Sequence, residues 1–166
     1  MGPQSLNTEQ DLSAAIGRFG QPLLRYCHHI LCDYHDAQDA VQTTFLKAWE
    51  HRGGFRAGSS LQAWLYRLAY TTCVDMLRRR KRWLPPPPVQ REGDGYIGPE
   101  LRAALQSLTA EERGLVYGRV MEERSYEELA QIYGVSPAAL RKRYERARKK
   151  LAGLLTAKEE RYETGT

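Results

Sequence analysis

The sequence predicts an all-α protein built from two small helical domains that a proline-rich linker joins. Apolar residues recur at spacings of three and four along most of the chain, which is the period of an amphipathic helix. No segment of any length alternates apolar and polar residues as a strand does. Four consecutive prolines, Pro85–Pro88, interrupt the pattern and favour an extended path. The predicted division is residues 1–83 for the first domain, 84–99 for the linker and 100–166 for the second domain, which is a helix-turn-helix.

The composition is that of a folded, basic protein. The chain has 166 residues, of which 42% are hydrophobic and 27% are charged, and these fractions are typical of globular domains. The net charge is +5, and the excess is concentrated at Arg78–Arg82 and Arg141–Lys150. Clustered positive charge indicates nucleic-acid binding, although either run alone would be interpreted as a solvated face.

Several other classes of protein are disfavoured by the same sequence. Three cysteines predict no disulfide framework, the first residues lack the apolar core of a signal peptide, and no run approaches the ~18–20 apolar residues of a membrane span. We therefore expect a cytoplasmic protein without membrane insertion. The nearest approach to a metal site is the group Cys27, His28, His29, Cys32 and His35. Its spacing lacks the ligand pairs of zinc sites, so we expect no metal and no cofactor, and no catalytic arrangement is found.

Start signals predict three helices before the central one. Thr8 and Asp11 begin the first, Gly20 ends it, Pro22 stands near the first turn of the second, and Asp36 caps the third. One face of the third helix carries a mixed stripe at helical spacing: Asp39, Gln42, Thr43 and Leu46. On spacing alone this stripe fits a protein partner or an ordinary polar face with one stray leucine equally well.

The longest predicted helix, Ser59–Arg82, organises the first domain. Ser59 and Gln62 have the spacing of a capping box, and two apolar stripes then follow, so the helix is expected to be covered on two sides. It ends in five consecutive basic residues, which is more than a helix C-terminus needs and suggests contact with a phosphate backbone. Aromatic rings near positive charge also suit single-stranded DNA, because bases stack on rings.

The second domain is predicted from three further start signals. Thr109 and Ser125 are each followed three residues later by glutamate, which is the capping-box spacing. Gly134 supplies a turn, and Ser136 with the proline after it begins a last helix rich in Arg and Lys. Two helices across a glycine turn, the second of them basic, are typical of a helix-turn-helix. A purely structural helical hairpin is the weaker interpretation.

Three segments in order resemble the extracytoplasmic-function (ECF, sigma-70 family group IV) sigma factors of bacterial RNA polymerase: Asp36–His51, Ala63–Arg82 and Ser107–Leu151. The resemblance runs from about Gly20 to Leu155 and includes the linker. It implies a specificity subunit without catalytic activity of its own, which binds core polymerase and directs promoter-specific transcription initiation. The implied partners are the clamp helices of the largest polymerase subunit, the flap region, promoter DNA and an anti-sigma factor.

The resemblance also implies roles for individual residues. Polymerase binding is implied for Asp39, Gln42, Thr43 and Leu46. Recognition and melting of the minus-ten promoter element is implied for Phe55, Arg56, Ser59, Ser60, Trp64, Arg67, Tyr70, Thr71, Arg78 and Arg79. Recognition of the minus-35 element is implied for Ser136, Ala139, Arg141, Lys142, Arg143, Arg146 and Lys149.

Two positions depart from the family pattern. Thr71 stands where the family usually has asparagine, and a hydroxyl lacks the paired donor and acceptor of an amide, so the base preference is expected to differ. Ala139 stands where relatives often have threonine. An alanine cannot hydrogen-bond a base edge, so Arg141, Lys142 or their neighbours must read the sequence.

Two other classes of function were weighed against the sigma factor. A helix-turn-helix repressor or activator would bind duplex DNA without polymerase, but the first half shows no ligand-pocket or dimerisation pattern. A helical adaptor that binds no DNA is disfavoured by the two separate basic clusters. Co-purification with core polymerase separates the three.

Overall fold

The structure is a computed structural model that describes residues 4–56, 58–82 and 97–164. Within these residues it is entirely helical, which confirms the all-α class. The elements are α1 (Glu9–Leu31), α2 (Tyr34–Glu50), the short 3-10 helix η1 (Arg52–Gly54), α3 (Leu61–Arg82), α4 (Pro99–Gln106), α5 (Ala110–Val120), α6 (Tyr126–Tyr133) and α7 (Pro137–Thr164). The prolines of the predicted linker lie outside the described residues.

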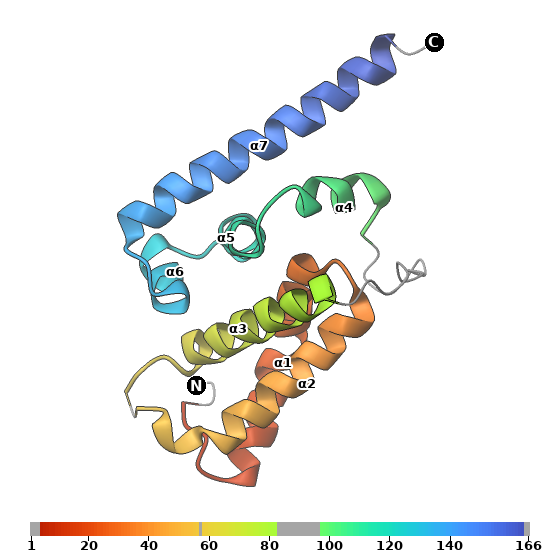
Figure 1. Cartoon of the computed structure of the whole chain (residues 1–166). Coiled ribbons are helices and arrows are strands. Elements are labelled where there is room, and N and C mark those ends of the chain that lie inside the picture. The colour runs from red at the N-terminus through yellow and green to blue at the C-terminus, as the bar shows by residue number, and fades with distance from the viewer. Residues whose placement is uncertain (1–3, 57, 83–96, 165–166) are drawn as a thin grey trace.

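The helices form two units that pack against each other (Figure 1). The N-terminal unit consists of α1, α2 and α3, and the C-terminal unit consists of α4 to α7. Helix α5 packs on α1, and α6 packs on α3, while α7 lies on the outside of the C-terminal unit and projects past it. One buried apolar cluster contains residues of both units. The sequence left open whether the two halves touch, and the structure shows that they share a core.

The prediction of two helices before residue 31 was wrong, because α1 is continuous. Thr8 caps it as expected: its hydroxyl accepts a hydrogen bond from the Asp11 amide at 3.1 Å. Gly20 does not end the helix, and Pro22 lies inside it. An interior proline costs ~3 kcal/mol, whereas each fully buried large apolar side chain contributes about 1.5–3 kcal/mol. The stripe that offsets this cost is Ala15, Phe19, Leu23, Tyr26 and Ile30.

Helix α2 starts earlier than predicted. Asp33 is the cap, and its carboxylate accepts from the amide of Asp36 at 2.8 Å. Asp36 was the expected cap, but its side chain forms an ion pair with Arg80 near the end of α3. Aspartate is favourable both as the cap and in the first turn of a helix. Asp33 takes the first role, and Asp36, in the first turn, is left to pair with Arg80 of α3.

The cap of α3 is also displaced by one residue. The hydroxyl of Ser60, not that of Ser59, accepts from the amide of Ala63 at 3.1 Å. Both serines can cap a helix. Leu61, the first residue of the helix, is only 3% exposed, so the buried face of α3 begins directly after the cap.

The predicted starts in the C-terminal unit are confirmed. Thr109 and Ser125 each form a complete capping box. Gly134 ends α6 with φ of 65°, in the left-handed region where glycine is unstrained. The hydroxyl of Ser136 accepts from the amide of Ala139 at 3.2 Å, and α7 begins at the following proline. Helices α6 and α7 therefore form the expected helix-turn-helix.

The contact between the units, called the seam here, is made by Tyr26, Tyr66 and Tyr70 on one side and Gly114, Glu122 and Tyr133 on the other. The hydroxyl of Tyr66 donates to the Glu122 carboxylate at 2.5 Å. The ring of Tyr70 meets that of Tyr133 edge-on, with centroids 5.0 Å apart. These are hydrogen-bonded and aromatic contacts of the kind found in a protein core.

Candidate polymerase and nucleic-acid interfaces

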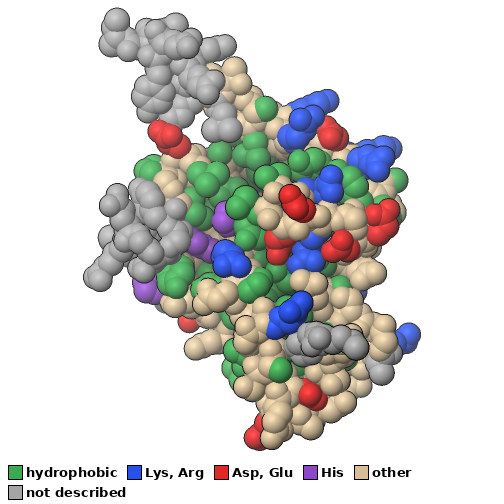
Figure 2. Space-filling model, turned by 180° about the vertical axis from the view of Figure 1, so that it is seen from behind, with side chains coloured by type: hydrophobic (Ala, Val, Ile, Leu, Met, Phe, Trp, Pro, Cys, Tyr) green, Lys and Arg blue, Asp and Glu red, His purple; other side chains and the backbone are tan. Residues whose placement is uncertain are grey.

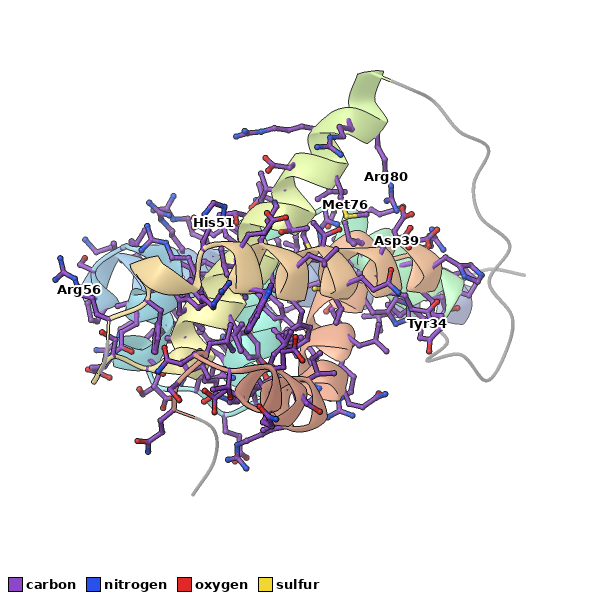
Figure 3. All side chains as sticks on the ribbon, turned by 90° about the horizontal axis from the view of Figure 1, so that it is seen from below. Tyr34, Asp39, His51, Arg56, Met76 and Arg80 are labelled. Carbon is purple, nitrogen blue, oxygen red and sulfur yellow. The ribbon has the colours of Figure 1, made fainter. Side chains whose placement is uncertain are left out.

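The predicted polymerase stripe lies on the outer face of α2. Asp39, Gln42 and Leu46 are exposed, and Thr43 is half-buried. Leu46 is 64% exposed, on the face of α2 that is opposite to its packed face. Figure 3 shows Asp39 near the start of α2 and pointing away from α1. The helix therefore presents an acidic, an amide and an apolar side chain together, which suits a protein surface.

A cavity of about 1100 Å³ lies where α3 begins. Its wall includes five of the residues to which the resemblance assigned the minus-ten element: Phe55, Ser59, Ser60, Trp64 and Arg67. The rings of Phe55 and Trp64 have centroids 5.3 Å apart. The cavity thus joins an aromatic pair, hydroxyl groups and a positive charge. Such an arrangement is chemically compatible with an unpaired nucleotide, because a ring can stack on a base while a cation meets the phosphate.

Arg56 lies beside this cavity but does not line it. It is exposed and projects from the end of the molecule beyond His51 (Figure 3).

The other minus-ten candidates do not join the cavity. Thr71 is exposed, and its hydroxyl donates to the backbone carbonyl of Leu68 at 3.0 Å. Tyr70 is half-buried in the seam, so the C-terminal unit covers part of its ring. Arg78 and Arg79 are exposed near the other end of α3, about 21 Å along the helix from Trp64. They form a second group of exposed basic side chains on the same helix, away from the cavity.

The basic face of α7 carries the predicted minus-35 residues. Arg141, Lys142, Arg146 and Lys149 are exposed. Figure 2 shows Lys and Arg side chains gathered along the upper right of the molecule, over the C-terminal unit. Ser136 is used as the cap, and Ala139 is half-buried against the unit.

Arg143 behaves differently from its basic neighbours. Its guanidinium forms an ion pair with Glu111 of α5 at 2.5 Å. A paired guanidinium has fewer donors to offer to a base edge. The exposed basic residues in the early part of α7 are therefore Arg141 and Lys142, and the guanidinium of Arg141 lies 5.2 Å from the centre of the Tyr126 ring.

The seam contains a polar cluster that the sequence did not predict. Arg124 is only 7% exposed, pairs with Glu122 at 3.3 Å, and lies 4.3 Å from the centre of the Tyr66 ring. Burial raises the pKa of Tyr66, and the Glu122 carboxylate adds to the rise, so this phenol stays protonated and donates to the carboxylate. The buried Arg124 guanidinium is thus held in place by the Glu122 carboxylate and the Tyr66 ring.

One sequence signal could have indicated the seam. Gly114 and Gly118 lie four residues apart inside α5, where each glycine costs about 1 kcal/mol relative to alanine. A Cβ at Gly114 would lie 2.5 Å from the hydroxyl of Tyr133 and 3.0 Å from that of Tyr26. A Cβ at Gly118 would lie 2.8 Å from Leu129. Gly114 is therefore required by the close approach of the two units, whereas Gly118 makes room for Leu129 within its own unit; close packing is a usual reason for glycine inside a helix.

Two negative findings concern the described residues alone. They hold no group of three or more His, Cys, Asp or Glu side chains placed to bind a metal ion. None of their helices combines the length and the apolar character that a bilayer crossing requires.

Comparison with known families gives two matches in the order of the two units. Residues 15–83 match the family model described as Sigma-70 region 2, and residues 99–151 match that of Sigma-70, region 4. The first match contains the α2 stripe and the cavity-forming part of α3, and the second contains the basic face of α7.

Several curated relatives are similar in sequence. The chain is 31% identical to RNA polymerase sigma factor YlaC of Bacillus subtilis, over 83% of this chain and 86% of that one. It is 32% identical to ECF RNA polymerase sigma factor SigE of Mycolicibacterium smegmatis, over 79% and 56%. It is 43% identical to SigG of Mycobacterium tuberculosis, over 45% and 20%. The chain thus spans a fifth of the length of the SigG relative and little more than half that of the SigE relative.

Two solved structures share the fold. One is the sigma factor RpoE in complex with the anti-sigma factor NepR from Bartonella quintana, with a TM-score of 0.73, 25% identity, and coverage of 89% of this chain and 98% of that one. The other is CnrH in complex with the cytosolic domain of CnrY, with a TM-score of 0.70, 23% identity and 91% coverage of each chain.

Proposed function

Because the chain belongs to the extracytoplasmic-function sigma factors, we propose that it binds core RNA polymerase and directs transcription from a specific set of promoters. The observation that carries this proposal is that both sigma regions occur in order, each with several of its expected contact residues exposed or lining the cavity. The protein acts in the cytoplasm as a specificity subunit, and the chemistry of RNA synthesis belongs to the core enzyme.

The α2 stripe is the proposed docking face for the clamp helices of the largest polymerase subunit. Leu46 supplies apolar area for a contact, and Asp39 supplies charge that orients it. Electrostatic complementarity of this kind sets the register and the association rate more than the affinity. Lys47 turns toward α3, where it donates to the Thr72 hydroxyl at 3.2 Å.

The cavity at the start of α3 is the proposed reader of the opened minus-ten element. A protein shifts the equilibrium between paired and unpaired DNA only if it binds one form more tightly than the other. An aromatic pair in a cavity accepts a base that has left the stack, but not one that remains inside a duplex. Arg78 and Arg79 then hold the backbone of the same strand farther along α3.

The first half of α7 is the proposed reader of the duplex minus-35 element, and the flap region of polymerase is the proposed second docking point of the C-terminal unit. In helix-turn-helix docking the first turns of the second helix reach base edges, and later residues meet phosphates. Arg141 and Lys142 occupy the early positions, and Lys149 occupies a late one.

The closed arrangement is the proposed resting form. In it Tyr66 and part of Tyr70 are covered by the C-terminal unit. Reading both promoter elements at once requires the two units to separate. A protein that binds both units in the closed form would oppose polymerase binding, so an anti-sigma factor is a proposed partner.

The proposal is tested by co-purification with core polymerase from a bacterial source. The wild-type chain is expected to bind the core enzyme, and Asp39→Arg combined with Leu46→Ala is expected to weaken binding at least tenfold with unchanged helicity. A control, Gln21→Arg, adds positive charge to the exposed face of α1 and should bind normally. Equal affinity of the double variant and the wild type would remove the docking assignment.

A further inference from the structure

The residues before α1 form part of the cavity wall. Gln4, Ser5 and Asn7 line the cavity at the start of α3. Leu6, between them, points the other way and is only 1% exposed in the shared core. Alternation of a buried anchor with cavity-facing polar residues fixes which side chains the segment presents.

A carboxylate holds this segment in place. One oxygen of Asp11 accepts hydrogen bonds from the amide of Asn7 at 2.9 Å, the amide of Thr8 at 3.0 Å and the hydroxyl of Ser5 at 3.2 Å. The amides of Asn7 and Thr8 lower the pKa of Asp11. A capping box needs only one of these bonds. The other two continue past the cap and fix the chain that precedes the helix.

The chemistry of the cavity wall is that of a nucleotide site. Arg18 of α1 and Arg67 of α3 both line it, and no Asp or Glu side chain does so among the described residues. Side-chain amides line it as well, on Gln4, Asn7, Gln62 and Gln131. An amide presents a donor and an acceptor side by side, which matches the edges of bases. Two cations without an acid suit the phosphate that accompanies a base.

Asn7 is the amide best placed to read a base. Its backbone amide is held by Asp11, and its side chain lies exposed on the cavity wall. Gln131 belongs to α6, so it moves away with the C-terminal unit when the seam opens. Asn7 stays with the N-terminal unit because Leu6 and Asp11 anchor it there.

We propose that the segment Gln4–Asn7 completes the pocket for an unpaired promoter base, and that the Asn7 side chain helps to determine which base is accepted. This inference rests on the proposed function of the cavity. It adds a determinant that lies outside the shared family region, which begins at residue 15. A reader outside that region gives this chain a base preference of its own.

The test uses the full chain bound to core polymerase and a set of single-stranded oligonucleotides from the non-template strand of a promoter. Each position of the minus-ten element carries each of the four bases in turn, and affinities are measured by competition in fluorescence anisotropy. Asn7→Ala is expected to reduce discrimination at one position by a factor on the order of 5–100, with affinity for the least preferred base changed less than twofold. Asp11→Ala, which releases the segment, should reduce discrimination at the same position.

A matched control removes an amide close by. Gln10 is exposed and does not line the cavity, so Gln10→Ala should keep the full base preference. If Asn7→Ala discriminates among bases as the wild type does at every position, the inference is wrong while the proposed function stands. If the wild-type holoenzyme shows no preference among bases at any position, the proposed function of the cavity fails as well.

Discussion

The phenol oxygens of Tyr26 and Tyr133 lie 2.7 Å apart, although 107 residues separate them in the sequence. One hydroxyl donates to the other across the seam. Burial raises the pKa of both phenols far above the ordinary value, so both remain protonated and the pair carries no charge. The bond is possible because Gly114 has no side chain to occupy the space beside the two hydroxyls.

Gly114→Ala is expected to open the seam. The new Cβ would lie 2.5 Å from the Tyr133 hydroxyl, and the rings on both sides are packed, so the units must move apart. Alanine is also about 1 kcal/mol more favourable than glycine inside a helix. Unfolding of α5 would therefore not explain a separation of the units. Small-angle scattering should report a larger radius of gyration. Gly17→Ala, on α1 with no atom near its Cβ position, is the control, and a Gly114→Ala variant as compact as this control would contradict the packing described.

Acid is expected to open the seam as well. His29 lies against the Tyr117 ring of α5, with centroids 4.4 Å apart, and burial lowers its pKa. Burial also lowers the pKa of His28; His29 and Arg102 add to this, and Asp33 opposes it. The Nε2 atom of His28 has no hydrogen-bond partner among the described residues.

The direction of the pH effect follows from these shifts. The closed form binds fewer protons than an open form whose histidines have ordinary pKa values near 6.5. Closed-form stability is therefore complete above about pH 7.5 and is lost as the pH falls through about 6.5 toward the lowered values. Distance measurements between labels on α2 and α7 should lengthen over this range. Replacing both residues, His28→Asn with His29→Asn, should remove the response, whereas the exposed His35 can be changed without effect. If the pH response survives the double replacement, it arises from titratable groups other than His28 and His29.

The two ends of the basic face of α7 should behave differently on DNA. Alanine at Arg141 is expected to cost ~1–3 kcal/mol and to relax the preference at one base pair of the minus-35 element. Alanine at Lys149 should weaken binding to all sequences alike and reduce the salt slope by about one. Binding of the C-terminal unit on polymerase to duplex variants, measured at several salt concentrations, checks both. The reverse pattern would mean that the helix docks in another orientation.

Arg78→Ala with Arg79→Ala should impair promoter opening more than promoter binding. Both side chains are exposed near the end of α3 and carry the charge that the proposed function assigns to the backbone of the non-template strand. Permanganate footprinting should show complexes that form but contain few unpaired thymines. Melting at the wild-type level in this double variant would move the contact to another surface.

Local sequence signals predicted most of the helix boundaries in the C-terminal unit. They failed where contacts between residues far apart in the sequence determine the structure. The caps at Thr109, Ser125 and Gly134 depend on neighbours within a few residues, so the sequence shows them directly. Pro22 was misinterpreted because its local cost is outweighed by burial along the whole of α1. The Tyr26–Tyr133 pair has no local pattern at all.

The cavity was predictable in part for the same reason. Its residues from Phe55 to Arg67 are close in sequence and belong to one loop and helix start, so a motif could indicate them. Its other wall comes from Gln4, Ser5, Asn7, Arg18 and Gln131, and only the packing of α1 and α6 against α3 brings these residues to the same place.

Run-off transcription with purified core polymerase on fragments of the host genome tests the central claim most directly. Addition of the wild-type chain is expected to yield discrete transcripts from a small subset of fragments, each preceded by a shared pair of promoter elements. The Asp39→Arg, Leu46→Ala variant should yield none. If the wild-type chain binds particular duplex fragments but neither associates with core polymerase nor produces any transcript, the protein is a DNA-binding regulator and not a functioning sigma factor.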